Sequence, residues 1–177
     1  VTLRELVEQV GPDATRFVML ARKNDASLDF DFDKVLEQTK ENPIFYVQYA
    51  HARICSVMRK ATDLGMAVDD NTLAGLDLNS ISDSSELSLA AKVAEFPRLV
   101  EIAARSNEPH RIAFYLYELA SEFHSLWNKG NDHPRLRFLQ QDDPATSCSK
   151  IVLIRCTAVV ISTGLGILGI TPVQEMR

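Results

Sequence analysis

Apolar residues recur every three to four positions along most of this 177-residue chain, which is the spacing of one buried helix face. We predict helices where this pattern runs between Gly, Pro and capping residues. The expected ranges are 2–10, 12–21, 34–40, 42–64, 86–105, 109–127 and 146–168, with a break at Pro97. Residues 28–32 alternate instead and favour a short extended segment. The pattern therefore indicates an all-α fold built around a bundle of roughly five to six helices.

The helix that begins at Asn42 has two distinct faces. Asn42 is a favourable N-cap and Pro43 suits the first helical position. One face is apolar and predicts a buried stripe of Val47, Ala50, Ile54, Val57 or Met58, and Ala61. The same spacing places a second row on a neighbouring face, made of Tyr46, Tyr49, Arg53, Ser56 and Lys60.

Two aromatic rings followed by cations along one helix suit a stacked base and a neutralised phosphate. From spacing alone, the commoner explanation is a pair of half-buried core tyrosines with solvated hydroxyls. A net charge of −5 argues against a protein that coats nucleic acid broadly, although it permits a narrow basic ridge. The row therefore suggests a small surface for single-stranded nucleic acid without deciding the matter.

Composition narrows the setting further. The three cysteines are an odd number without metal-like spacing, and this indicates reduced thiols in a cytoplasmic protein. The first residue is Val1 and a helical pattern starts at once, so we expect a fragment of a longer protein. The linker-like composition of residues 69–85 predicts a surface loop, as do the Gly, Pro and Asp breaks in residues 129–149.

Other chemistries find little support. Residues 151–170 are nearly long enough to span a bilayer, but Arg155 and the glycines favour a buried helix and no membrane contact. Residues 164–169 spell a dinucleotide-type glycine pattern, yet too few residues follow for the strands that such a site needs. Asp29 and Asp31 lack the glycine and distal glutamate of a calcium loop, and no catalytic or metal-binding residues are predicted.

Several segments, in order along the chain, carry a further signal: residues 3–7 with 11–17, 22–31, 42–53, 108–124 and 169–176. Together they resemble the arginyl-tRNA synthetase family. The Asp-Ala-x-Arg sequence at residues 13–16 is the pattern that gives this family's tRNA-binding domain its common name. The similarity covers nearly the whole chain and is weak only from about residue 62 to residue 87.

The resemblance implies an anticodon-binding helical bundle of the class I synthetase type. Residues 1–32 would be the end of the catalytic and stem-contact region, and residues 33–177 would be the bundle. The family activates arginine with ATP and Mg²⁺ through a His-x-Gly-His-like motif and a Lys-rich loop, and neither stands in this chain. We therefore expect a parent arginine–tRNA ligase in the cytoplasm, and a chain that is inactive alone and holds no cofactor.

The resemblance also implies a site and its partners, an arginine-specific tRNA and the missing catalytic domain. The tRNA-binding residues carried over are Tyr46, Tyr49, Arg53, His124, Trp127 and Met176. Phosphate contacts would come from Arg16, Arg22, Lys23 and Lys60. The family often has an aromatic residue where Leu126 stands, and Trp127 would take that role. The alternative is a helical module that binds proteins through Tyr and Trp anchors and binds no RNA.

Overall fold

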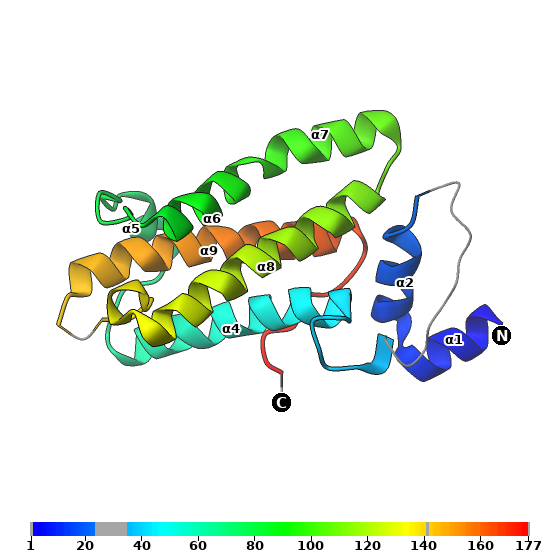
Figure 1. Ribbon diagram of the computed structural model, residues 1–177, viewed down its shortest axis with the longest axis horizontal. Helices are drawn as coiled ribbons and strands as arrows, with labels where there is room; N and C mark the ends of the chain where they lie inside the picture. Colours follow the sequence, from blue (N-terminus) through cyan, green and yellow to red (C-terminus); the bar gives the residue numbers. More distant parts are fainter. Residues whose placement is uncertain (1, 24–34, 141, 177) are drawn as a thin grey trace.

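The computed structural model describes residues 2–23, 35–140 and 142–176, and within these ranges it contains helices and no strand (Figure 1). The helices are α1 (Leu3–Val10), α2 (Pro12–Leu20), α4 (Pro43–Asp63), α5 (Asp70–Ala74), α6 (Ser84–Ala94), α7 (Phe96–Ser106), α8 (His110–Asp132), η1 (Pro134–Leu136) and α9 (Pro144–Ile167). The predicted all-α fold is confirmed. The extended segment expected at 28–32 lies outside the described residues, as does the first residue of the helix expected at 34–40, and residues 37–40 are not helical.

Local signals in the sequence set the helix starts. Thr2 and Glu5 form a reciprocal capping box at α1, and Pro12 opens α2. The Asn42 side chain accepts a hydrogen bond from the Phe45 amide at 3.3 Å, so α4 begins where its cap predicts. Pro97 sits in the first turn of α7, and α6 ends just before it, which confirms the predicted break.

The core forms where α4, α8 and α9 lie side by side, with α6 covering α8 and α9 (Figure 1). The apolar stripe of α4 is buried as predicted, and Ile54 is fully inaccessible. Leu116 and Phe123 of α8 and Ile161 of α9 are equally buried. This burial fixes α4 along its length and leaves its neighbouring face for other contacts.

Helix α9 is the one helix in the described part of the chain that is long and apolar enough to cross a membrane. Within its most apolar stretch, 56% of the residues are buried inside the bundle. It packs against α4, α6 and α8, as the core helix of a bundle does.

Gly164 allows α8 and α9 to approach closely. A methyl group built at Gly164 would lie 2.7 Å from a terminal carbon of Leu116 and 3.2 Å from two more of its atoms. Gly166, two residues on, has nothing within 4 Å. Gly169 has a φ of 71° and closes the turn after α9, a conformation that suits glycine. Gly164 therefore serves close helix packing, and Gly169 serves the turn that follows α9.

Replacing Gly164 by alanine should therefore overpack the core and lower the free energy of unfolding by about 1–3 kcal/mol. Gly166→Ala is the matched control and should be neutral or should raise it by about 0.5–1 kcal/mol, because alanine favours the helix. Urea denaturation of both variants measures the difference. Equal stability of the two would show that Leu116 rearranges without cost.

Three sequence predictions need correction. The supposed loop at 69–85 contains α5, whose Leu73 is 4% exposed and packs on Ala61 and Ile151. Helix α8 continues to Asp132, past the expected end at Trp127. The apolar spacing that predicts a buried face for residues 86–105 includes Ile102, which is 40% exposed and lies outside the core.

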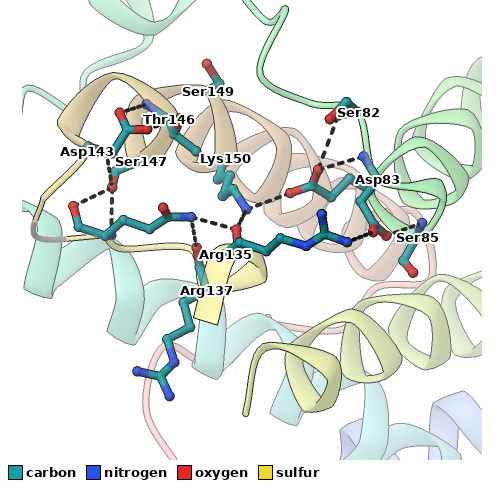
Figure 2. Close-up of polar contacts among 12 residues, drawn as sticks. Ser82, Asp83, Ser85, Arg135, Arg137, Asp143, Thr146, Ser147, Ser149 and Lys150 are labelled. Carbon is teal, nitrogen blue, oxygen red and sulfur yellow. Dashed lines mark hydrogen bonds and ion pairs between the residues drawn. The ribbon is translucent and has the colours of Figure 1, made fainter. Parts of the chain in front are cut away.

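The segment from η1 to the start of α9 is held by a buried polar network (Figure 2). Lys150 forms an ion pair with Glu86 at 2.8 Å, and the two side chains are 3% and 4% exposed. Lys150 also donates to the carbonyl of Arg135, and so does the Gln140 side chain, at 2.6 Å. The backbone amide of Gln140 donates to Ser147 Oγ at 2.7 Å. The sequence predicted a long loop here, whereas the structure ties it to α6 and α9.

Candidate nucleic-acid interface

Arg53 is the centre of an aromatic cluster between α4 and α8. Its guanidinium carbon lies 4.2 Å from the centroid of the Tyr49 ring and 4.8 Å from the centroid of the Trp127 ring. Tyr49 and Arg53 are one helical turn apart on α4, and Trp127 comes from α8. All three are only partly buried. We call this group the Arg53 platform; cation–π contacts of this kind fix a cation next to rings that can stack on a base.

His124 supports the platform from below. It is 3% exposed, and its ring lies 4.4 Å from the Tyr46 ring and 5.5 Å from the Tyr49 ring. Arg53 Nη1 lies 3.3 Å from His124 Nδ1, and His124 Nε2 lies 3.2 Å from the Tyr46 carbonyl. Because a guanidinium only donates, Nδ1 accepts and Nε2–H donates, which is the neutral tautomer. The predicted direct contact of His124 with RNA needs correction, since the side chain is buried and instead positions Arg53.

The C-terminal tail passes α4 (Figure 1) and is bound by side chains of that helix. The Gln48 side chain donates to the Thr171 carbonyl and accepts from the Val173 amide, both at 2.8 Å. His51 Nδ1 donates to the Val173 carbonyl, also at 2.8 Å. Gln48 and His51 are buried, at 6% and 7% exposure. The two side chains therefore bind the backbone of the tail and fix its position against α4.

An open pocket of about 260 Å³ lies between the tail and α4. Its lining includes Tyr49, Arg53, Ser56, Arg59 and Met176. Three of the predicted site residues, Tyr49, Arg53 and Met176, therefore line one pocket. Arg59 donates to the Gln174 carbonyl at 3.3 Å and approaches the Glu175 carboxylate at 3.6 Å, which holds the tail at the pocket edge. The pocket combines a ring, two guanidinium groups and a flexible apolar side chain, a set that suits an unpaired base.

A family model described as the DALR anticodon binding domain matches residues 47–176, which include the platform, the tail and the pocket. The chain belongs to the DALR anticodon-binding domain family. It is 70% identical, over all of its length, to an arginine–tRNA ligase of Cereibacter sphaeroides. It is 67% identical, again over its whole length, to the corresponding ligase of Roseobacter denitrificans. In both comparisons the chain spans 30% of the relative's length.

Solved structures agree with this assignment of the DALR domain. An arginyl-tRNA synthetase from Thermus thermophilus aligns with a TM-score of 0.74 and 26% identity, over 99% of this chain and 28% of that one. A Campylobacter jejuni structure assigned as an arginyl-tRNA synthetase gives a TM-score of 0.84 and 27% identity, over 99% of this chain and 36% of that one. The predicted recognition and bundle type are confirmed.

The predicted phosphate contacts of the DALR domain are scattered. Lys60 lies further along α4, on the edge of a second pocket that Trp127 also lines. Arg16 donates to the Gly169 carbonyl at 2.5 Å and lies 3.5 Å from the Asp13 carboxylate, so it ties α2 to the turn after α9. Arg22 and Lys23 follow the end of α2, outside the group of residues that line the two pockets. Of these four described residues, Lys60 is the one that lines a pocket together with a residue of the Arg53 platform, Trp127.

Helical spacing did not indicate three residues that shape the DALR-domain site: Gln48, His51 and Arg59. Each recognises the tail, which is more than a hundred residues away along the chain, and helical spacing carries no information about such contacts. A buried glutamine and histidine next to an apolar stripe were the available signal, because buried polar groups need partners. Among the described residues, no group of three His, Cys, Asp or Glu side chains could hold a metal ion.

Burial, with a smaller contribution from the Arg53 charge, lowers the pKa of His124 from its ordinary 6.5 to about 4. As the pH falls, His124 therefore binds a proton in the unfolded chain before it does so in the folded chain. The contribution of the neutral side chain to the free energy of unfolding is complete above pH 6.5 and is lost as the pH falls towards 4. We expect this loss to reach about 3 kcal/mol. Urea denaturation between pH 7 and 4 should show it in the native sequence. His124→Gln can keep both hydrogen bonds without titrating and should show a flatter profile; parallel profiles would contradict the assignment.

Proposed function

We propose that this DALR domain binds the anticodon loop of an arginine-specific tRNA, as part of a longer arginine–tRNA ligase. The observation that carries the proposal is the Arg53 platform, together with the open pocket that the C-terminal tail borders. Proteins read RNA sequence mainly in single-stranded loops, by stacking on rings and by hydrogen bonds to base edges. Tyr49, Arg53 and Trp127 supply both kinds of group at one place.

Each side chain has a role in this proposal. The Tyr49 and Trp127 rings stack on unpaired bases, and Arg53 donates to a base edge or a phosphate. Met176 covers the base from the tail, and its flexible thioether adapts to the base shape. Tyr46, whose ring contacts His124 and Tyr117, supports the platform at its inner side.

The remainder of the ligase completes the reaction in this proposal. ATP, Mg²⁺ and the transfer of arginine to tRNA belong to a catalytic domain that these residues do not supply, so the chain alone should be inactive. Residues 1–32 would bridge to that domain and residues 33–177 would form the anticodon-binding unit. The cytoplasm is the proposed location, which three free cysteines support.

A titration with anticodon stem-loops tests the proposal. A stem-loop with the central anticodon cytosine should bind more tightly than the same stem-loop with a central guanine, because a purine presents a larger ring and a different base edge to the pocket side chains. We expect a preference of about 1–3 kcal/mol, the value of one well-placed base contact. Equal affinity for both, or no binding, would favour the alternative of a protein-binding helical module.

Arg53→Ala should change the salt dependence of this binding. If the guanidinium neutralises one phosphate, its removal lowers the slope of log affinity against log salt by about 0.7. Arg105→Ala is a suitable control, because Arg105 is an exposed arginine of α7 whose guanidinium pairs with Glu101 at 2.7 Å. Affinity measured at several salt concentrations gives both slopes. An unchanged slope would assign Arg53 to base contact alone.

A further inference from the structure

Trp127 also lines a second open pocket, on the side that leads away from the tail. This pocket has a volume of about 260 Å³ and lies between the second halves of α4 and α8 and the segment 136–139. We call it the Trp127 pocket; its lining includes Val57, Lys60, Trp127, Asn131, Arg137 and Phe138. It therefore adjoins the Arg53 platform, because Arg53 rests on the same indole ring at 4.8 Å.

The lining of the Trp127 pocket divides into an apolar floor and a polar rim. Val57 and Phe138 are 6% and 7% exposed and form the floor with the indole. Lys60, Asn131 and Arg137 are exposed and form the rim. A nucleotide has the matching division, since its base has flat apolar faces and polar edges while its phosphate is anionic. The Asn131 amide can donate to and accept from a base edge, and the two cations can meet phosphates.

The outer wall of the Trp127 pocket is fixed before any ligand arrives. Gln140 donates to the carbonyls of Arg135 and Arg137, at 2.6 and 3.4 Å, and Arg137 Nε donates to the Gly130 carbonyl at 3.1 Å. The buried Lys150 side chain also donates to the Arg135 carbonyl (Figure 2). A wall that is already ordered spares a ligand the entropy of ordering it, as in preorganised binding sites.

The two pockets follow one another along α4. Arg53 and Ser56 line the first, and Val57 and Lys60 line the second. Since a helix rises 1.5 Å per residue, Arg53 and Lys60 are about 10 Å apart along the axis. Successive bases of a single strand stack on successive aromatic surfaces while cations track the backbone. The spacing and the shared indole suit neighbouring nucleotides of one strand.

We propose that the Trp127 pocket is a second nucleotide subsite, which takes an unpaired base of the same RNA loop next to the base held at the Arg53 platform. Asn131 contacts the base edge, and Lys60 and Arg137 contact the flanking phosphates. This inference rests on the proposed function, since it assigns a second contact of the same RNA. It differs in its residues and in the loop position that it reads.

A double-mutant cycle between protein and RNA tests the second subsite. The RNA probes are the anticodon stem-loop and a set in which each loop position in turn is abasic. The protein variants are Asn131→Ala and Lys60→Ala, with Asn128→Ala and Lys40→Ala as matched controls that lie outside the Trp127 pocket. Thermal unfolding of each variant confirms that it is folded, and fluorescence titration gives each affinity.

We expect one abasic position, other than the central cytosine, to weaken binding to the native sequence by about 5- to 100-fold. The same RNA change should cost about fivefold less in Asn131→Ala, because that variant has already lost the contact. Lys60→Ala should lower the salt slope by about 0.7, and the Lys40 control should leave it unchanged.

The outcomes separate this inference from the proposed function. If Tyr49→Ala weakens binding but Asn131→Ala and every abasic position combine additively, the second subsite is wrong and the first stands. Coupling of Asn131 to the central cytosine alone would also overturn it, since one base would then occupy both places. If the native sequence does not bind the anticodon stem-loop, the proposed function fails, and the second subsite fails with it.

Discussion

Replacing Lys150 by methionine should lower the free energy of unfolding by about 3–5 kcal/mol. The change leaves the Glu86 carboxylate in the interior, 4% exposed, without the ammonium group that lies 2.8 Å away in the native protein. Two backbone amides, of Ser82 and Asp83, still donate to Glu86 at 3.3 and 3.2 Å, but they carry no full positive charge. Urea denaturation followed by circular dichroism measures the loss.

Two variants make this expectation specific. Lys92→Met removes a lysine that lies 2.6 Å from Glu118, whose side chain is 60% exposed, and it should cost less than about 1 kcal/mol. The double variant Lys150→Met/Glu86→Gln removes both charges but keeps an oxygen for the Ser82 and Asp83 amides, so it should recover most of the loss. A loss for Lys150→Met no larger than that for Lys92→Met would contradict the argument.

The Lys150→Met substitution should also change the surroundings of Trp127 at the candidate site. Lys150 holds the Arg135 carbonyl, and three residues on, Phe138 stacks on Phe123 at 5.8 Å and lies 6.0 Å from the Trp127 ring. Release of this segment exposes the indole to water. Because Trp127 is the only tryptophan of the chain, its fluorescence emission should move to longer wavelength in folded Lys150→Met.

Tyr49→Ala should weaken binding of the anticodon stem-loop by about 1–3 kcal/mol, the value of one stacked base. The tyrosine ring both lines the pocket beside Met176 and carries the Arg53 guanidinium at 4.2 Å. Its removal therefore takes away a stacking surface and frees Arg53 to adopt other conformations. The affinity of the folded variant for the stem-loop, measured at fixed salt, tests this expectation.

The controls for Tyr49 separate the ring from its hydroxyl and from aromatic surface in general. Tyr49→Phe keeps the ring and should retain most of the affinity. Phe114→Ala removes an aromatic residue of α8 that is 49% exposed and outside the lining of both pockets, and it should have no effect. Unchanged affinity of Tyr49→Ala would remove this residue from the site.

Local signals explain what could be predicted from the sequence. The Asn42 cap and the break at Pro97 each act within one helical turn, and each lies where it was expected. The row from Tyr46 to Arg53 was visible for the same reason, since residues three and four apart share a helix face. The structure brings these residues together with Trp127 but leaves their contact with RNA as a proposal.

Contacts between distant segments explain what could not be predicted. Gly130 resembled a loop signal, yet α8 continues through it, and Gly130 lies close to the backbone of Leu136 and Arg137. The burial of His124 depends on Tyr46 and Arg53 from another helix, and the place of the tail depends on Gln48. The Lys150–Glu86 pair joins residues far apart in the chain, and the sequence around each residue does not indicate that its side chain is buried.

Helix α4 contributes to the hydrophobic core and to the Arg53 platform at the same time. Val47, Ala50 and Ile54 are inaccessible to solvent, while Tyr49 and Arg53 project from the adjoining face of the same rigid cylinder. No hinge within α4 can separate those two side chains without breaking the core around them. In the proposed complex the RNA loop would therefore undergo most of the conformational change. Its bases would have to unstack and turn outward to fit the fixed side chains of α4.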